Sequence, residues 1–396
     1  MSRSVRMFGY GFLAVVLVLY LTALGLSGAE IGLLLALTLL GDAAISLWLT
    51  THADRIGRRR VLLVGAGLML VAGLAFAASP VYVVLVVAAT IGVISPSGNE
   101  VGPFLAVEQA SLSQIVGAKR RTSVFARYQL AGSLATASGA LVAGVVAQLA
   151  IQRGAHAADA YRIVIVGYGL IGVVLAALFT RVSANVEVPS SAVDEEPIRG
   201  RLGLHRSQGT VLRLSALFAL DAFAGGFVMA SFIALWFQQR FAVDPAAIGA
   251  LIFGANLLAG LSALAAGPLA ARFGLVRTMV FSHLPSNVLL ILVPLMPTVA
   301  LAAGVLLVRF SISQMDVPTR QSYTLAIVAP DERSAAAGVT NIARSLGVAV
   351  SPLIAGPLFL TAGLAGLPFV IAGGLKIVYD LLLYQRFRAL RPPEEA

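Results

Sequence analysis

The chain has 396 residues and a net charge of +10, and 59% of its residues are hydrophobic while only 12% are charged. Soluble domains carry about 25% charged residues, so this composition excludes a soluble enzyme, a DNA-binding protein and a disordered chain. Because the chain has no cysteine and only four histidines, we expect no disulfide, no metal centre and no cofactor. We likewise expect no nucleic-acid partner.

Apolar runs long enough to cross a bilayer follow one another along the whole chain. They predict an all-α polytopic membrane protein with about twelve transmembrane helices. The first run is too long for a cleavable signal peptide, so we count it as the first helix. The runs cover 7–27, 30–50, 61–79, 81–116, 122–150, 162–181, 211–238, 246–270, 277–297, 299–329, 334–360 and 363–385.

One polar segment, 183–210, is much longer than the other breaks. It is rich in Ser, Pro, Gly and mixed charge, a composition typical of a flexible linker. It divides the chain into an N-terminal six-helix bundle, 1–182, and a C-terminal six-helix bundle, 211–396.

The loop charges indicate the orientation of the chain. Of the 28 Lys and Arg residues, 20 lie in the two terminal segments and in every second loop, including Arg3 and Arg6 before the first helix. The opposite loops hold only Arg153, Arg162 and Arg240. The positive-inside rule therefore predicts that both termini and the linker are cytoplasmic. We expect a multi-pass protein of the cytoplasmic (inner) membrane, surrounded by membrane lipid and acting as a monomer.

The two halves resemble each other in sequence. ADRIGRRR, 53–60, aligns with AARFGLVR, 270–277, and EQASLSQIVGAKRRTS, 108–123, aligns with RQSYTLAIVAPDERSA, 320–335. A duplicated six-helix unit is typical of secondary transporters, whose site lies at the repeat interface near the bilayer midplane.

The fourth apolar run is too long for one straight crossing, since its residues would span about 54 Å as a helix. The segment SPSGNEVGP, 95–103, contains two prolines and two glycines. We therefore expect a broken or unwound helix there, which is tolerated where the backbone faces protein or a cavity. The alternative is one long helix with a kink at Pro96 or Pro103.

The segment HADRIGRRR, 52–60, resembles the cytoplasmic loop signature of the major facilitator superfamily, in which an Asp-Arg pair precedes Gly and basic residues. Two later stretches also resemble patterns of this family, 309–338 in the tenth helix and the loop after it, and the glycine-proline stretch 347–356 in the eleventh helix. The residues that match the loop signature are Asp54, Arg55, Gly57 and Arg58.

The resemblance covers essentially the whole chain. It implies the fold of that superfamily, two pseudo-symmetric six-helix bundles with helices 1, 4, 7 and 10 around a central cavity. It also implies a conformational latch, in which Asp54 sits near the positive end of a neighbouring helix and pairs with arginine, and release frees one half to rock against the other. The alternative is that these loop charges serve only to orient the chain.

Ionisable side chains inside membrane helices are costly and are candidate functional residues. In the tenth helix Arg309, Ser313, Asp316 and Arg320 fall at i, i+4, i+7 and i+11, which predicts one helix face. Asp316 and Arg320 can pair within the helix, and the surplus positive charge needs a carboxylate or a substrate to balance it. The alternative is an ion pair that only stabilises the bundle.

Glu100 and Glu108 in the fourth helix are the expected balancing carboxylates, because the repeat and the family's fold place them opposite the tenth helix. Such carboxylates suit a group that loads and releases a proton, so we predict proton coupling. Neutral donors and acceptors beside them are Asn99, Gln109 and Gln321.

Other intramembrane charges are candidates for substrate or proton binding. Asp221 and Asp42 lie near the middle of the seventh and second helices, and either could instead be held by a Ser or a backbone group. Arg127, Asn341 and Arg344 could flank the cavity, or the charged ones could reach the cytoplasmic surface. We expect Lys376 and Asp380, at i and i+4 in the last helix, to form a structural pair.

These features favour a secondary active transporter of a small solute or ion, and not an enzyme. The chain has no Walker signature, so ATP does not drive it directly. The leading hypothesis is proton-coupled export by antiport. The alternatives are proton-coupled uptake of an organic or inorganic anion and, more remotely, a membrane sensor without transport activity.

Overall fold

The computed structural model describes residues 1–115, 118–182, 187, 204–329, 332–388 and 390. The described residues are 83% helical and contain no strand. Among the described residues, ten helical spans are long and apolar enough to cross a membrane. Two shorter apolar helices, Tyr82–Ile91 and Val299–Phe310, lie in the fourth and tenth apolar runs. The predicted all-α membrane fold is therefore confirmed, as expected where helices satisfy their own backbone hydrogen bonds in lipid.

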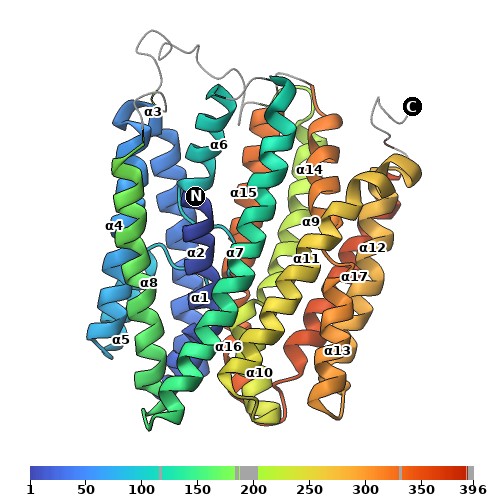
Figure 1. Cartoon of the computed structure of the whole chain (residues 1–396). Coiled ribbons are helices and arrows are strands. Elements are labelled where there is room, and N and C mark those ends of the chain that lie inside the picture. Colours follow the sequence, from blue (N-terminus) through green and yellow to red (C-terminus); the bar gives the residue numbers. More distant parts are fainter. Residues whose placement is uncertain (116–117, 183–186, 188–203, 330–331, 389, 391–396) are drawn as a thin grey trace. The chain divides into compact units, whose positions relative to one another are not determined.

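The chain forms two compact units. Unit 1 comprises Met1–Glu195 and Met229–Phe253, and unit 2 comprises Glu196–Val228 and Gly254–Ala396. Unit 1 contains α1 (Ser2–Ala23), α2 (Gly28–Thr51), α3 (Ala53–Ile56), α4 (Arg58–Ala78), α5 (Tyr82–Ile91), α6 (Phe104–Ile115), α7 (Ala118–Gln152), α8 (Ala157–Thr180), α10 (Ala230–Phe241) and the first part of α11 (Pro245–Phe273) (Figure 1). Unit 2 contains α9 (Gln208–Gly226), the rest of α11, α12 (Leu275–Leu292), the short 3-10 helix η4 (Val293–Leu295), α13 (Val299–Phe310), α14 (Asp316–Ala326), α15 (Arg333–Val350), α16 (Pro352–Leu360) and α17 (Leu367–Phe387).

In unit 1, α1 is buried on nearly every side because it packs against α7, α8 and α10. Its contact with α7 depends on small residues. A Cβ added to Gly11 would lie 2.0 Å from the carbonyl oxygen of Thr136, and one added to Gly139 would lie 2.0 Å from that of Phe8. Glycine is therefore required on both helices for this approach, as in other membrane helix pairs.

In unit 2, α9 packs against α15 and α17. The contact with α15 again depends on glycine, since a Cβ on Gly347 would lie 2.3 Å from the carbonyl oxygen of Ala219. The apolar core joins α9, α12, α14 and α17 through Phe218, Met279, Tyr323 and Leu383. These helices carry Asp221, His283, Asp316, Arg320, Lys376 and Asp380, so the core fixes the helices that hold those side chains.

Four of the predicted apolar runs are interrupted, the eleventh only at Ser351 between α15 and α16. The fourth breaks between α5 and α6, the seventh between α9 and α10, and the tenth between α13 and α14. The predicted break in 95–103 is confirmed and extends over 92–103, so the alternative of one kinked helix is wrong. The expectation that Arg309 and Arg320 share one continuous helix is also wrong, because residues 311–315 are not helical.

In the break between α5 and α6, side chains from other helices form hydrogen bonds with backbone groups that have no helical partner. Tyr10 and Tyr168 donate hydrogen bonds to the carbonyl oxygens of Val101 and Val93, and the N–H of Gly102 donates to Asp42 at 2.7 Å. Burial of an unsatisfied peptide group costs free energy, so these contacts explain how the break is tolerated inside the unit.

Glycine begins α4 and α12 at corresponding positions of the sequence repeat. Gly57 has φ +100° and Gly274 has φ +87°, a region that L-residues with a side chain rarely adopt. The same glycine conformation at aligned positions supports the internal repeat found in the sequence.

Carboxylates close the N-termini of α4 and α9. Glu187 accepts hydrogen bonds from the N–H groups of Arg58 at 2.8 Å and Arg59 at 3.0 Å. Glu332 accepts from the N–H groups of His205 and, at 2.7 Å, Arg206, just before α9. A negative charge at a helix N-terminus is stabilising because it meets unpaired N–H groups.

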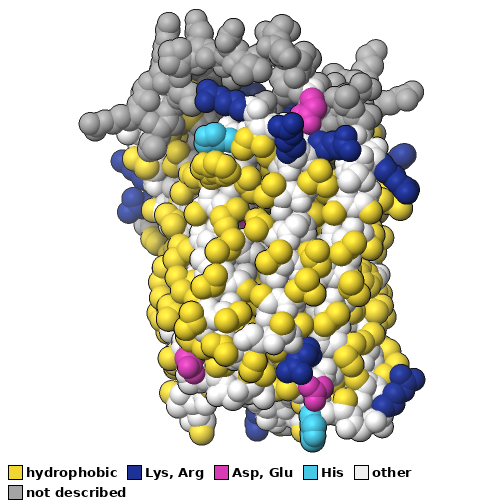
Figure 2. All heavy atoms as spheres, turned by 90° about the vertical axis from the view of Figure 1, so that its left-hand side faces the viewer, with side chains coloured by type: hydrophobic (Ala, Val, Ile, Leu, Met, Phe, Trp, Pro, Cys, Tyr) yellow, Lys and Arg dark blue, Asp and Glu magenta, His cyan; other side chains and the backbone are white. Residues whose placement is uncertain are grey.

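Hydrophobic side chains cover the middle of the face seen in Figure 2, and Lys and Arg side chains gather toward its ends. In unit 1, Val71, Val83 and Leu170 are 62%, 67% and 55% exposed. Large exposed apolar surfaces indicate contact with lipid or another apolar partner, as expected of a multi-pass membrane protein.

Candidate functional site

Unit 2 contains a buried carboxylate that contacts three cations. Asp221, on α9, is 4% exposed. Its Oδ1 lies 2.5 Å from Nζ of Lys376 on α17. Its Oδ2 lies 3.0 Å from Nη1 of Arg344 on α15 and 3.2 Å from Nη1 of Arg320 on α14. One carboxylate therefore links four helices of the unit, and it is far outnumbered by positive charge.

A second carboxylate of unit 2 supports one of these cations. Asp316 accepts a hydrogen bond from Nη1 of Arg320 at 2.9 Å, which confirms the predicted i,i+4 pair within α14. Arg309, at the end of α13, is only 8% exposed, and its Nε has no hydrogen-bond partner among the described residues. The hydroxyl of Ser313 in the break between α13 and α14 is likewise unpaired there.

The expected pair between Lys376 and Asp380 on α17 is wrong. Lys376 contacts Asp221 instead, and Asp380 accepts from Nδ2 of Asn287 at 2.8 Å and lies 2.9 Å from Nδ1 of His283 on α12. Asp380 is 1% exposed and His283 is 4% exposed. The partners of Lys376 and of Asp380 therefore lie on helices distant in sequence, and an i,i+4 spacing within one helix cannot predict them.

Unit 1 contains a separate cluster of buried charges. Arg6 on α1 is 0% exposed. It donates from Nη1 and Nη2 to the two oxygens of Glu108 at 2.9 and 3.0 Å, and from Nε to Glu100 at 2.6 Å. Such a two-pronged arginine–carboxylate contact is among the stronger charged hydrogen bonds. It ties α1 to α6 and to the segment just before α6.

The rest of this cluster completes its charge balance. Nη1 of Arg3 lies 3.0 Å from Oε2 of Glu100, and Nη2 donates to Gln129 at 2.8 Å. The hydroxyl groups of Tyr128 and Ser2 donate to Glu108. Two arginines and two glutamates therefore neutralise one another within unit 1.

The expectation that Arg3 and Arg6 are loop charges is wrong, because both lie in α1 and are 4% and 0% exposed. They, and not the tenth helix, supply the partners of Glu100 and Glu108. The sequence signal that could have indicated this is the presence of two carboxylates in the fourth run with no cation inside that run to pair with them.

The remaining predicted residues have few contacts with the two clusters. Asp42 is held by the N–H of Gly102 and lies 3.3 Å from the hydroxyl of Ser46, which matches the alternative of a carboxylate held by a Ser and a backbone group. The neutral candidates and one arginine are exposed: Asn99, Gln109, Arg127, Gln321 and Asn341.

The predicted latch is only partly visible. The side chain of Asp54 lies outside the described part of the structure. Arg55 is exposed and Arg58 is 8% exposed. Gly57 provides the positive φ between α3 and α4. The carboxylate next to this loop is Glu187, which the sequence did not indicate because it lies in the linker.

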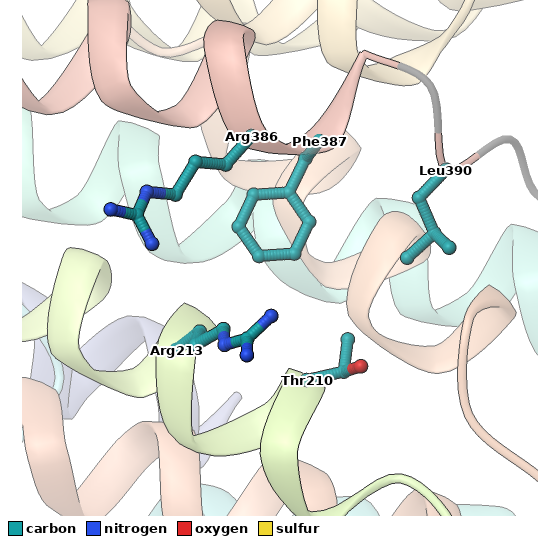
Figure 3. A pocket seen from close by; sticks show the side chains of 5 residues that line it. All are labelled: Thr210, Arg213, Arg386, Phe387 and Leu390. Carbon is teal, nitrogen blue, oxygen red and sulfur yellow. The ribbon is translucent and has the colours of Figure 1, made fainter.

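A cavity of 260 Å³ lies where α9 begins and α17 ends. Arg213 and Arg386 reach toward it from the two helices (Figure 3). The buried carboxylates of unit 2 do not line it, so it is separate from the charged cluster. Its lining residues are Thr210, Arg213, Arg386, Phe387 and Leu390. Among the described residues there is also no group of three His, Cys, Asp or Glu side chains that could hold a metal ion.

The family model described as the Major Facilitator Superfamily matches residues 1–228 and 214–396, and so covers the whole chain. The chain belongs to the major facilitator superfamily. Family and fold are those of transporters and not of enzymes. This superfamily member is therefore a membrane transporter of a small solute.

Known proteins resemble this superfamily member over nearly its full length. The uncharacterized membrane protein YJR124C of Saccharomyces cerevisiae is 29% identical over 96% of this chain and 91% of its own. The crystal structure of nucleoside transporter NupG has a TM-score of 0.75 at 13% identity, covering 98% of this chain and 97% of NupG. The D-xylose–proton symporter has a TM-score of 0.72 at 14% identity, covering 97% and 95%. At these identities the solved structures support the fold alone.

For this superfamily member the sequence missed four buried charged or titratable residues. They are Arg3, Arg6, His283 and Lys376, whose contact with Asp221 the sequence did not indicate. Charge balance was the sequence signal that could have indicated them. A carboxylate inside a membrane helix needs a cationic partner, which can come from another helix of the same half.

Proposed function

We propose that this transporter couples solute movement to protons, with Asp221 as the carboxylate that takes up and releases the coupling proton. The observation that carries this proposal is the contact of one buried carboxylate with Lys376, Arg344 and Arg320. When Asp221 is ionised, it forms ion pairs with these cations. When it is protonated, Lys376, Arg344 and Arg320 lose it as a counter-charge, and a buried cation with too little counter-charge is unfavourable.

We propose that the transported solute is an anion, which replaces ionised Asp221 as the counter-charge of these cations. Arg344 is 29% exposed in its side chain, while Asp221 is 5% exposed, so an incoming anion meets an arginine before it meets the carboxylate. Arg309 adds a further buried cation with an unpaired Nε. Guanidinium groups bind carboxylate and phosphate oxygens through paired hydrogen bonds, which suits an organic or inorganic anion.

The geometry then favours uptake of an anion together with a proton. Protonation of Asp221 frees cations for the anion, and by linkage the bound anion must increase the affinity of Asp221 for its proton by the same factor. Proton and solute therefore bind together, which is the requirement for symport. The anion is expected to bind more tightly as the pH falls.

Export by proton antiport is the second candidate. It is favoured by the glycine-proline stretch 347–356, since Gly347 allows α15 to approach the backbone of α9 at Ala219, the helix that carries Asp221. Antiport requires that proton and solute exclude each other, so the solute would have to compete with the proton for a carboxylate.

We further propose that the bundles 1–182 and 211–396 rock against each other during transport, with the latch around Asp54 controlling the movement. We place the protein in the cytoplasmic membrane as a monomer, with both termini in the cytoplasm, because the loop charges favour that orientation.

The test is transport by the purified protein in proteoliposomes. A panel of labelled organic and inorganic anions is screened by counterflow, and an inward proton gradient is then imposed. We expect accumulation of an anion together with acidification of the vesicle lumen. In Asp221→Asn we expect gradient-driven accumulation to fall at least about tenfold while exchange of labelled for unlabelled anion persists, because only the proton site is lost.

The matched control is Asp159→Asn, which changes an exposed carboxylate, 51% exposed in its side chain, and should leave both measurements unchanged. Solute transport that ignores the imposed pH gradient would refute proton coupling. Proton movement opposite to the solute would instead support antiport.

A further inference from the structure

His283 is the buried histidine of unit 2, and its surroundings differ from those of a surface histidine. It lies on α12, which packs side by side with α17 (Figure 1). Its Nδ1 is 2.9 Å from Oδ1 of Asp380, and Asn287 donates to the other oxygen of Asp380 at 2.8 Å. Because Asp380 is 1% exposed, this carboxylate depends on the histidine and the amide for stabilisation.

Lys376 connects this pair to the proposed coupling carboxylate. It lies one helical turn before Asp380 on α17, so the two side chains leave the same face of the helix. Its Nζ is 2.5 Å from Asp221. Lys376 therefore contacts Asp221 directly and also acts electrostatically on Asp380.

We propose that His283 is a second proton-binding residue, coupled to Asp221 through Lys376. This inference rests on the proposed function, in which Asp221 takes up a proton. In one state Asp221 is ionised and pairs with Lys376, and Asp380 pairs with an imidazolium at His283. In the other state Asp221 is protonated, Lys376 pairs with Asp380, and His283 is neutral.

The two states contain the same number of protons and the same charge. An N–H bond of the imidazolium breaks and an O–H bond forms on Asp221, while Lys376 keeps its three protons and changes partner. Moving net charge in or out of a buried cluster is costly. An exchange that conserves charge avoids that cost, so the pair at His283 makes protonation of Asp221 feasible without leaving Lys376 unpaired.

The groups around His283 are consistent with this role. Within unit 2 the elements packed against α12 include α13, α14 and α17, and Asp221 on α9 also acts on the histidine electrostatically. The ring of Tyr379 stands edge-on to the imidazole, with centroids 6.1 Å apart. The charged or titratable groups on these elements are Arg213, Asp221, Arg309, Asp316, Arg320, Tyr323, Lys376, Tyr379, Asp380, Tyr384 and Arg386. Arg320 is paired with Asp221 and Asp316, which leaves Asp380 as the carboxylate in contact with the histidine.

The test follows the protonation of His283 directly and needs no solute. The full chain, labelled with ¹⁵N-histidine, is placed in lipid nanodiscs, and the ring nitrogen signals are recorded between pH 4 and pH 9. His283→Gln assigns the buried signal among the four histidines. The proposal requires the ring nitrogen signals of His283 to change between those of the protonated and the neutral imidazole within this range.

Two variants then test the coupling in opposite directions. Asp221→Asn leaves Lys376 without its carboxylate, so we expect the midpoint of the His283 titration to move down by at least about one pH unit. Lys376→Gln leaves Asp221 as an additional negative charge, so the midpoint should move up. The exposed His156 and the variant Asp42→Asn, in unit 1, serve as controls and should show no change.

A histidine that does not titrate between pH 4 and pH 9, or that titrates identically in both variants, overturns the inference and leaves a structural hydrogen bond. That result is distinct from failure of the proposed function, which is measured by proton movement during transport in the wild type. A coupled His283 in a protein whose transport ignores pH would reject the proposed function and not the electrostatic link.

Discussion

Arg6 illustrates how a single charged residue is accommodated in an apolar unit. Its guanidinium is 0% exposed and donates to both Glu108 and Glu100. Removing two charges from water costs several kcal/mol per ion, so the pair is tolerated only because its hydrogen bonds are complete. The contacts of Tyr128 and Ser2 with Glu108 complete them.

Comparison of a single with a double substitution should show that the Arg6–Glu108 contact matters mainly because one buried charge without the other is costly. Glu108→Gln leaves Arg6 partly uncompensated, and we expect it to lower the free energy of unfolding by about 3–5 kcal/mol. Arg6→Met combined with Glu108→Leu should recover most of that loss, since neither charge is then buried. The measurement is denaturant unfolding of the purified protein in detergent.

The surface pair Arg162–Asp159 offers the matched comparison, because its side chains are 39% and 51% exposed. Arg162→Ala should change the stability by less than about 1 kcal/mol. Equal losses at the two pairs would mean that burial does not determine their strength.

At the scale of the helices, the main structural feature is that some membrane-length apolar runs are interrupted by non-helical segments. The segment between α5 and α6 contains Gly98 at φ +72° and Gly102 at φ +78°, and Tyr10, Tyr168 and Asp42 satisfy its backbone. Interrupted helices in corresponding positions of two repeats are typical of transporters. Here the fourth and the tenth apolar runs are both interrupted.

Gly57 provides a test of backbone conformation at the start of α4. Because its φ is +100°, Gly57→Ala should destabilise unit 1 by about 1–2 kcal/mol. Gly67→Ala is the control within the same helix, where an added Cβ meets nothing within 4 Å, and it should stabilise by about 0.5–1 kcal/mol. Thermal unfolding of both variants measures the difference, and a loss at Gly67 equal to that at Gly57 would contradict the explanation.

Glu332 makes the stability of the α9 N-terminus depend on pH. Hydrogen bonds from the N–H of His205 and from Ser207 lower the pKa of Glu332 from 4.5 to about 2. A lowered pKa stabilises the folded state above the unfolded pKa, and the effect is lost as the pH falls from about 4.5 to about 2. Glu332→Gln should therefore be less stable than the wild type at pH 7, with the difference shrinking below pH 4.5. A difference that grows toward acid pH would be the opposite of this expectation.

At the scale of the whole molecule, the two halves share a fold but differ in charge. Gly57 and Gly274 begin α4 and α12 with the same backbone conformation. The cluster of unit 1 balances its own charges, whereas unit 2 places Asp221 among three cations. This asymmetry explains why we assign the coupling proton to unit 2 and a structural role to Arg6 and Glu108.

The orientation can be tested because the chain contains no cysteine. Arg60→Cys and Arg153→Cys place single thiols at exposed positions at opposite ends of unit 1 helices. A maleimide that cannot cross the membrane should label Arg153→Cys in intact cells and Arg60→Cys only after lysis, because positive loops stay in the cytoplasm. The reverse labelling would invert the proposed orientation, and the wild type should remain unlabelled.

The sequence alone determined the membrane class, the apolar runs, the repeat and the break near Pro96 and Pro103, because hydropathy, glycine and proline act locally along the chain. It also identified the pair Asp316–Arg320, whose partners are one helical turn apart. Only the tertiary structure decided that Arg6 pairs with Glu108, that Lys376 pairs with Asp221 and that His283 pairs with Asp380. These partners are far apart in sequence, and a buried charge takes whichever counter-charge helix packing brings within hydrogen-bond distance.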